Sequence, residues 1–229
     1  MKTIGLLGGM SWESTVGYYQ VMNEEVNARL GGLHSAKIIM HSVDFEPLRQ
    51  QMLDCDWDTI GEHLAGVARI LEQGGADMIV IGTNTMHKVA PQIQAAVSVP
   101  VIHIVDATGE EARRAGFLKV GLLGTIFTME DGFYADRLRE QGVDVVVPSA
   151  EDRKIVDWVV FNELCKGVLN GDSRSEYLRI IEDMVEHGAQ AVILGCTEIG
   201  LLVRPGDTAV PMLDTCRIHA LKAVDIALT

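Results

Sequence analysis

Short apolar segments recur along the whole chain, with helical segments between them. The apolar segments are rich in Val, Ile and Leu and do not alternate with polar residues, as expected for parallel strands that are covered on both faces. Glycines at 74–75 and 188 provide stops for two of the intervening helices. The expected strands are 3–8, 37–43, 77–82, 100–105, 119–124, 143–148, 190–195 and 210–214, and the clearest expected helices are 14–30, 58–73, 131–141 and 174–187. This repeated order predicts an α/β fold with parallel sheets flanked by helices.

The strand–helix pattern also occurs twice. The segment 4-IGLLGGMSWE-13 resembles 120-VGLLGTIFTME-130, 75-GADMIVIGTNTM-86 aligns without gaps with 188-GAQAVILGCTEI-199, and 99-VPVIH-103 matches 210-VPMLD-214. A repeat of about 110 residues predicts two similar halves, each with a small parallel sheet. We expect a first domain of residues 1–104 plus 210–229 and a second domain of residues 105–209. A site would then lie between them, at the carboxyl ends of the strands.

Charge and hydropathy exclude several classes of partner. The net charge of −13 argues against binding to nucleic acid or to an acidic membrane, because both would repel the chain. An anionic small molecule is still compatible, since a local pocket rich in amide groups can override the overall field. No apolar run approaches the ~20 residues that a membrane span needs. The glycine-broken start, MKTIGLLGGMSWES, is interpreted as a strand and turn, not as a signal peptide.

The cysteines and histidines do not indicate a metal site. Cys55, Cys165, Cys196 and Cys216 stand far apart, without CxxC or zinc-finger spacing, and the seven histidines are scattered. Without a secretory signal, reduced thiols in the cytoplasm are the expected state.

A thiol follows one of the expected strands in 194-LGCTEIG-200. Cys196 comes just past the strand, before polar Thr197 and Glu198, so we expect it to be exposed at a turn. The N-terminal dipole of a following helix would favour its thiolate. The alternative is inert packing, since free cysteine is among the most buried residue types.

A hydroxyl follows the equivalent strand of the other half, in 82-GTNTMH-87. Thr83, Asn84 and Thr85 are either a turn with a helix cap or a cradle for a carboxylate. The repeat places Thr83 opposite Cys196 across the expected cleft.

The glycine turn 5-GLLGGMSWES-14 is neither a Walker loop nor a dinucleotide-binding fingerprint, and it predicts a tight turn with Ser11 as helix cap. The equivalent turn of the second half, 121-GLLGTIFTM-129, supplies Thr125 and Thr128 at the corresponding strand end. Three polar residues, Arg49, Gln51 and Lys166, are candidates to meet a distal carboxylate, although such residues are more often solvated surface groups. The sequence leaves His87, His103 and Cys216 as structural residues.

With these motifs the sequence resembles the aspartate/glutamate racemase family of cofactor-independent amino-acid racemases. The resemblance covers essentially the whole chain, through GLLGGMSWES, NTMH, GLLGT, GCTEIG and VPMLD. It implies two pseudo-symmetric α/β domains, an active site between them and a homodimer. It also implies a 1,1-proton transfer at the α-carbon by two cysteines on opposite faces of the substrate, without pyridoxal phosphate.

Carried over residue by residue, the resemblance makes Cys196 the second catalytic cysteine and leaves Thr83 where the first should stand. The implied substrate-binding residues are Met10, Gln51, Asn84, Thr85, Thr128, Lys166 and Thr197. Of these, Lys166 would meet a side-chain carboxylate. The substrate would be an amino acid, either dicarboxylic or from a broader range.

The departure at Thr83 has a chemical consequence. A free thiol has a pKa of ~8.5 and can be brought near neutrality, whereas a threonine hydroxyl serves as a base only when another group activates it. The two faces of the site should therefore be unequal. We expect Cys196 to act on L-amino acids, with Thr83 relaying a proton. Two alternatives are a single-cysteine lyase or isomerase of the arylmalonate decarboxylase or maleate isomerase type, and a catalytically weak amino-acid-binding protein.

Overall fold

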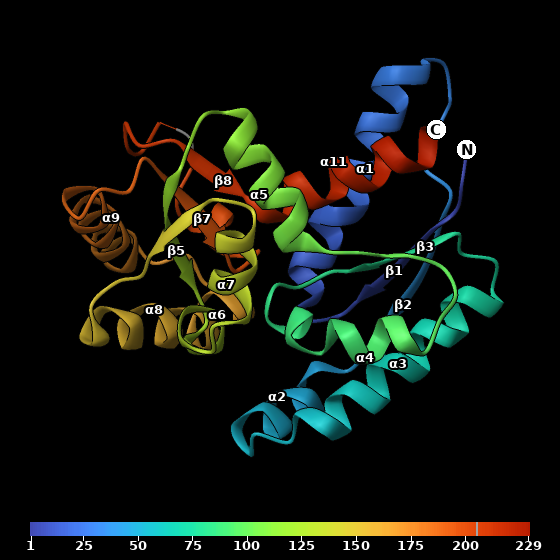
Figure 1. Ribbon diagram of the computed structural model, residues 1–229, viewed down its shortest axis with the longest axis horizontal. Coiled ribbons are helices and arrows are strands. Elements are labelled where there is room, and N and C mark those ends of the chain that lie inside the picture. Colours follow the sequence, from blue (N-terminus) through green and yellow to red (C-terminus); the bar gives the residue numbers. More distant parts are fainter. Residues whose placement is uncertain (205) are drawn as a thin grey trace. The chain divides into compact units, whose positions relative to one another are not determined.

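A computed structural model describes residues 1–204 and 206–229 (Figure 1). Contacts divide the chain into two compact units, Met1–Ile104 with His219–Thr229, and Val105–Ile218. In the described residues, each unit contains one four-stranded sheet whose paired strands are all parallel. The predicted α/β class is therefore confirmed.

The sheet of the first unit has the strand order β2-β1-β3-β4. Its strands are β1 (Ile4–Gly8), β2 (Ile38–Ser42), β3 (Met78–Ile81) and β4 (Val101–Ile102). Helices α1 and α11 lie on one face of this sheet, and α3 and α4 lie on the other (Figure 1). The helical segments are α1 (Trp12–Leu30), α2 (Phe45–Leu53), α3 (Trp57–Gln73), η1 (Thr85–Val89), α4 (Ala90–Ala95) and the later part of α11 (Thr215–Leu228).

The sheet of the second unit has the order β6-β5-β7-β8, which is the order of the first sheet shifted by four strands. Its strands are β5 (Lys119–Gly124), β6 (Asp144–Val146), β7 (Ala191–Gly195) and β8 (Met212–Asp214). Its helical segments are α5 (Ile104–Arg114), α6 (Ile126–Glu130), α7 (Phe133–Glu140), α8 (Ala150–Asn162), η2 (Leu164–Lys166), α9 (Gly171–Glu186) and α10 (Ile199–Leu202). The shared topology confirms the internal repeat that the sequence shows.

The central strands are the most buried elements of both sheets. Every residue of β1, β3 and β7 is buried, and in β5 only Lys119 is partly exposed. This explains why their sequences are continuously apolar, since neither face of a central parallel strand meets water. The glycine stops are also confirmed: Gly75 and Gly188 have φ of 96° and 95° after α3 and α9, a conformation that favours glycine.

The domain boundary differs from the sequence-based expectation. Residues 210–218 were expected in the first unit, but β8 pairs with β7 through Ile193 and Leu213, so this segment belongs to the second sheet. The chain returns to the first unit within α11, at His219. The expected strand at 100–105 is also shorter, because α5 already begins at Ile104.

Candidate active site

The Thr83 turn begins at the carboxyl end of β3. Gly82 lies so close to the neighbouring strand that a Cβ there would sit 3.2 Å from the carbonyl oxygen of Leu7, and its N–H donates to that oxygen at 2.8 Å. The next residue, Thr83, is partly exposed, whereas Asn84 and Thr85 are only 2% and 5% exposed. The three polar residues predicted from GTNTMH are therefore together at one strand end, with Thr83 the most accessible of them.

The glycine turn lies beside the Thr83 turn, because β1 pairs with β3. Gly9 has a φ of 93°, and a Cβ there would lie 2.3 Å from the carbonyl oxygen of Val43. The Gly9 N–H donates to Thr15 Oγ1 at 2.8 Å, and this hydroxyl donates to the carbonyl of Ser11, the N-cap residue of α1, at 2.8 Å. Met10, a predicted substrate-binding residue, is 2% exposed in this turn.

His87 fixes the backbone of the Thr83 turn. Its Nδ1 donates to the Thr83 carbonyl oxygen at 2.8 Å, and its Nε2 accepts from the Ile104 N–H at 3.1 Å. This pattern requires a neutral ring that is protonated on Nδ1. Burial, followed by the nearby His103, holds the pKa of His87 well below its usual value. His87 thus links the Thr83 turn to Ile104. Ile104 is the residue at which the chain leaves the first unit.

A second buried histidine lies against His87, with ring centroids 5.6 Å apart. The Nε2 of His219 donates to the Ile102 carbonyl at 2.7 Å, and its Nδ1 accepts from the Tyr18 hydroxyl at 2.9 Å. Burial lowers the pKa of His219 to about 3. The ring is therefore neutral at physiological pH and ties α11 to α1 and β4.

The Cys196 turn is the equivalent strand end of the second unit. A Cβ on Gly195 would lie 2.7 Å from the Leu123 carbonyl oxygen, the same close approach that Gly82 makes to Leu7. The Cys196 thiol donates to Glu198 Oε2 at 2.8 Å, and the Thr197 hydroxyl donates to the same oxygen at 3.0 Å. Thr197 is partly exposed, and Glu198 is 2% exposed.

The environment of Cys196 differs from the expectation. The residue is 8% exposed and belongs to the apolar core of its unit. Burial and then the Glu198 carboxylate raise the pKa of Cys196 well above its usual value, where the sequence suggested a lowered one. The reason is local: the carboxylate accepts the thiol proton directly, whereas the following helix, α10, has only four residues. The resting side chain is a thiol, hydrogen-bonded to a candidate proton acceptor.

Two further predicted residues lie in the second unit. Thr128 is 1% exposed at the start of α6, with its hydroxyl 3.2 Å from that of Thr125. Lys166 is exposed at the end of η2. The residue before it, Cys165, packs against the core cluster that contains Cys196 and contributes to the raised pKa of Cys196. The segment with Lys166 therefore runs close to Cys196, while the lysine side chain itself meets solvent.

One residue at these strand ends, Glu198, was not assigned a role from the sequence. A second, His87, was expected to be structural, in agreement with its backbone contacts. Glu198 follows the thiol by two positions, and a carboxylate at that spacing in GCTE was the available signal. His87 follows Thr83 by four residues, one helical turn, which allows its ring to reach back to the Thr83 carbonyl. The remaining predicted residue, Gln51, lies on α2. Among the described residues, no group of three or more His, Cys, Asp or Glu is arranged to hold a metal ion.

Two α/β repeats, each with a glycine and then a hydroxyl or thiol after its central strand, define a two-domain enzyme of the racemase class. The family described as Asp/Glu/Hydantoin racemase matches residues 7–223, and the chain belongs to this family.

Individual relatives agree with this assignment. The chain is 25% identical over 177 residues to a broad specificity amino-acid racemase of Bacillus subtilis. The aligned segment covers 76% of this chain and 74% of the relative. A candidate Asp/Glu racemase from Yersinia pestis has 49% identity and a TM-score of 0.92, with both chains covered completely. An aspartate racemase homologue from Pyrococcus horikoshii has 36% identity and a TM-score of 0.87, again over the full length of both chains. The expected resemblance is thus confirmed, and the enzyme class is that of the amino-acid racemases.

Proposed function

We propose that the chain is an amino-acid racemase that needs no pyridoxal phosphate and moves the α-proton with Cys196 on one face of the substrate and Thr83 on the other. The observation that carries this proposal is the equivalence of the two strand ends. Thr83 follows Gly82 after β3, and Cys196 follows Gly195 after β7, in sheets with the same strand order.

The proton step on the Cys196 side begins with a thiol. The Cys196 proton passes along the existing hydrogen bond to Glu198, which leaves a thiolate beside a neutral carboxylic acid. The thiolate then removes the α-proton of an L-amino acid and becomes a thiol again. The raised pKa makes the thiolate a strong base once it forms, in agreement with the need to abstract a weakly acidic proton.

The Thr83 side completes the inversion through water. The Thr83 hydroxyl donates its proton to the opposite face of the carbanion and takes a proton from a water molecule, which becomes hydroxide. Glu198 returns its proton to the hydroxide, so that protons and charge balance over the cycle. In the described part of the chain, no acidic or basic side chain hydrogen-bonds to the Thr83 hydroxyl, which supports a preference for L-substrates.

The residues near these two groups supply the binding contacts. We assign Asn84, Thr85, Thr128 and Thr197 to the α-carboxylate and amino group, since hydroxyl and amide groups satisfy both. Met10, Gln51 and Lys166 remain the candidates for contacts with the rest of the substrate.

We further propose that the enzyme works as a cytoplasmic homodimer. Trp12, Val16 and Tyr19 on α1 are 65%, 55% and 54% exposed, and their i, i+4, i+7 spacing places them on one face of the helix. Three large apolar side chains in one exposed stripe are the kind of surface that a second copy of the chain would cover. Within the described residues, no helix has both the length and the apolar character to cross a bilayer.

The test is a screen for α-proton exchange with solvent deuterium, using each L- and D-amino acid and no added cofactor. Cys196→Ala should abolish exchange and leave the circular dichroism spectrum unchanged, while Cys55→Ala, which alters an exposed cysteine, should keep full activity. Exchange that survives in Cys196→Ala would refute the mechanism. A chain that binds amino acids but exchanges none of them would be the binding protein instead.

A further inference from the structure

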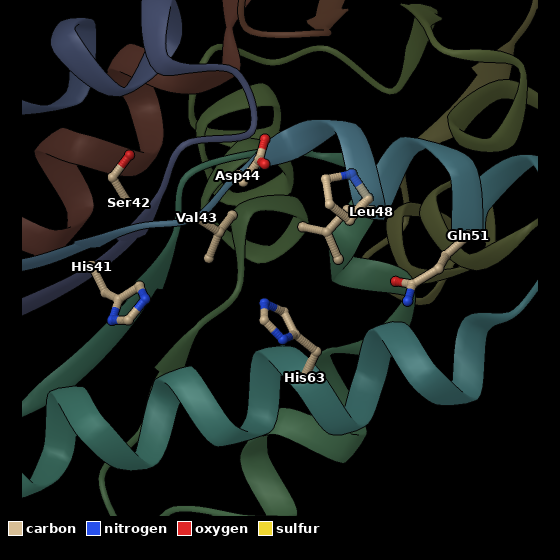
Figure 2. Close-up of a pocket in the computed structure, with 8 residues that line it drawn as sticks. His41, Ser42, Val43, Asp44, Leu48, Gln51 and His63 are labelled. Carbon is tan, nitrogen blue, oxygen red and sulfur yellow. The ribbon is translucent and has the colours of Figure 1, made fainter.

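Two of the seven histidines, all of which lie in the described part of the chain, are buried, and both belong to the first unit. His87 is 2% exposed and His219 is 0% exposed, with their ring centroids 5.6 Å apart in an edge-to-face arrangement. By contrast, His41 and His63 line a pocket at the end of β2 (Figure 2), where solvent reaches both side chains. A buried imidazole needs partners for both of its nitrogens, so the contacts of the two buried rings show what they hold in place.

The ring of His87 meets the Thr83 turn at a backbone atom. The segment after this turn, η1, is a 3₁₀ helix, and the His87 N–H donates to the Asn84 carbonyl, three residues back, at 3.0 Å. The Thr83 carbonyl, four residues back, accepts from the His87 Nδ1 at 2.8 Å. The Thr83 N–H donates to the Ile81 carbonyl at 2.9 Å. The orientation of the Thr83 residue therefore depends on a side chain as well as on the backbone.

The same two rings contact both segments through which the chain passes between the units. The chain leaves the first unit after Ile104, whose N–H donates to His87 Nε2 at 3.1 Å, and it returns at His219. The His219 Nε2 donates to the Ile102 carbonyl at 2.7 Å. The Thr83 turn is thus joined by one buried ring to the outgoing segment and, through the packing of the two rings, to the returning segment.

A small displacement of Thr83 has a large effect on proton delivery, because the transfer depends on distance and direction. The Thr83 hydroxyl belongs to the residue whose carbonyl His87 holds, so a rotation of the Thr83 backbone moves the hydroxyl. A misplacement of about 1 Å can slow an enzymatic step about 100-fold. Cys196 belongs to the other unit, and its thiol is held by Glu198. The contacts of His87 can therefore govern one face of the reaction without the other.

We propose that His87 is a positioning residue for the Thr83 face of the reaction, through the hydrogen bond from its Nδ1 to the Thr83 carbonyl, and that His219 braces it by packing against the ring. This inference rests on the proposed racemase function. It differs from a purely structural role because it gives the two nitrogens of His87 different tasks. The Nδ1 sets the turn that carries Thr83, whereas the Nε2 serves the connection to Ile104.

Asparagine and glutamine divide the two contacts of His87 between them. The amide nitrogen of asparagine matches the histidine Nδ1 in its distance from the backbone, so His87→Asn keeps the donor to Thr83 and loses the acceptor for Ile104. The longer glutamine matches the histidine Nε2, so His87→Gln keeps the acceptor and loses the donor. Each variant leaves one buried backbone group without a partner, and we expect both to lower the melting temperature by similar amounts.

The readout is the fate of an L-amino acid in deuterated water, with the substrate that the wild type turns over fastest. Deuterium in the D-isomer reports delivery by Thr83, whereas deuterium in the recovered L-isomer reports return by Cys196 after its proton has exchanged with solvent. The ratio of these two rates is taken within one sample, so any loss of folded protein cancels. We expect the ratio to fall about tenfold or more in His87→Gln and to stay within about twofold of wild type in His87→Asn.

His187 provides a matched control. Its Nδ1 lies 2.8 Å from the Asp183 carbonyl, also four residues back, but its side chain is exposed at the end of α9. His187→Gln removes the same kind of contact and should leave both rates unchanged. Equal ratios in His87→Gln and His87→Asn would reduce His87 to a structural residue and overturn the assignment. Deuterium exchange by the wild type would in that case keep the racemase function intact.

If the wild type exchanges no α-proton, the proposed function fails, and the link between the ring and the turn is tested by amide hydrogen exchange. Loss of the Nδ1 contact should make the backbone amides of residues 83–87 exchange about tenfold faster in His87→Gln than in His87→Asn. Equal amide exchange rates in the two variants would refute the link.

Discussion

Acidification from pH 7.5 to 5.0 should destabilise the first unit, because its buried histidines stay neutral in the folded chain. Burial lowers the pKa of His219 to about 3, whereas an unfolded chain protonates histidine near a pKa of about 6.5. Between these values the unfolded state holds a proton that the folded state does not. The free energy of unfolding therefore falls as the pH drops through this window and is fully retained above it.

The magnitude follows from the width of the window. Each pH unit below the unfolded pKa removes about 1.4 kcal/mol, so His219 alone removes about 2 kcal/mol between pH 6.5 and 5.0. The lowered pKa of His87, due to burial and then to His103, adds a loss of the same sign. Three carboxylates, Glu72, Asp152 and Asp207, have lowered pKa values, so they stay ionised in the folded chain at pH 5 and contribute little in this window.

The assay is urea unfolding at pH 7.5 and 5.0, followed by circular dichroism at one protein concentration. His219→Gln keeps a donor for the Ile102 carbonyl and an acceptor for the Tyr18 hydroxyl but does not titrate. The variant should lose about 2 kcal/mol less than wild type on acidification, even if it starts about 1–2 kcal/mol less stable. His34→Gln, at an exposed position, should behave as wild type. An equal loss in wild type and His219→Gln would refute the reasoning.

The remaining predictions concern catalysis and assembly. Glu198→Gln should lower exchange of L-substrates about 100-fold and reduce the pKa of Cys196, so that alkylation by iodoacetamide shifts to lower pH; an unmoved alkylation profile would contradict the thiol–carboxylate pair. Thr83→Cys should raise turnover of D-substrates, measured by deuterium entry into each enantiomer, and equal turnover of both enantiomers in the wild type would remove Thr83 from the reaction. Val16→Arg should shift sedimentation towards the monomer, and an unchanged sedimentation coefficient would place the dimer contact elsewhere.

The sequence by itself determines the architecture, because its signals are local and repeated. The apolar runs at 4–8 and 119–124 have no polar alternation, and burial on both faces of a central parallel strand is the physical cause of that pattern. The repeat extends the argument to topology, and both sheets adopt the same strand order. The repeat also identifies Thr83 and Cys196 as equivalent positions, because the segments that contain them align without gaps.

Only the tertiary structure decides the chemical state of these strand ends. Cys196 follows a strand in the sequence as an exposed residue would, but it lies in the core and its proton is held by Glu198. Sequence position carries no information about desolvation, and desolvation is the largest cause of its raised pKa.

The same holds for contacts between distant segments. His219 meets the Tyr18 hydroxyl across 201 positions of the chain and the Ile102 carbonyl across 117. The point at which α11 returns to the first unit is likewise set by the pairing of β8 with β7. A local pattern fixes which residues form strands and helices, whereas hydrogen bonds and burial depend on which of those elements the folded chain brings together.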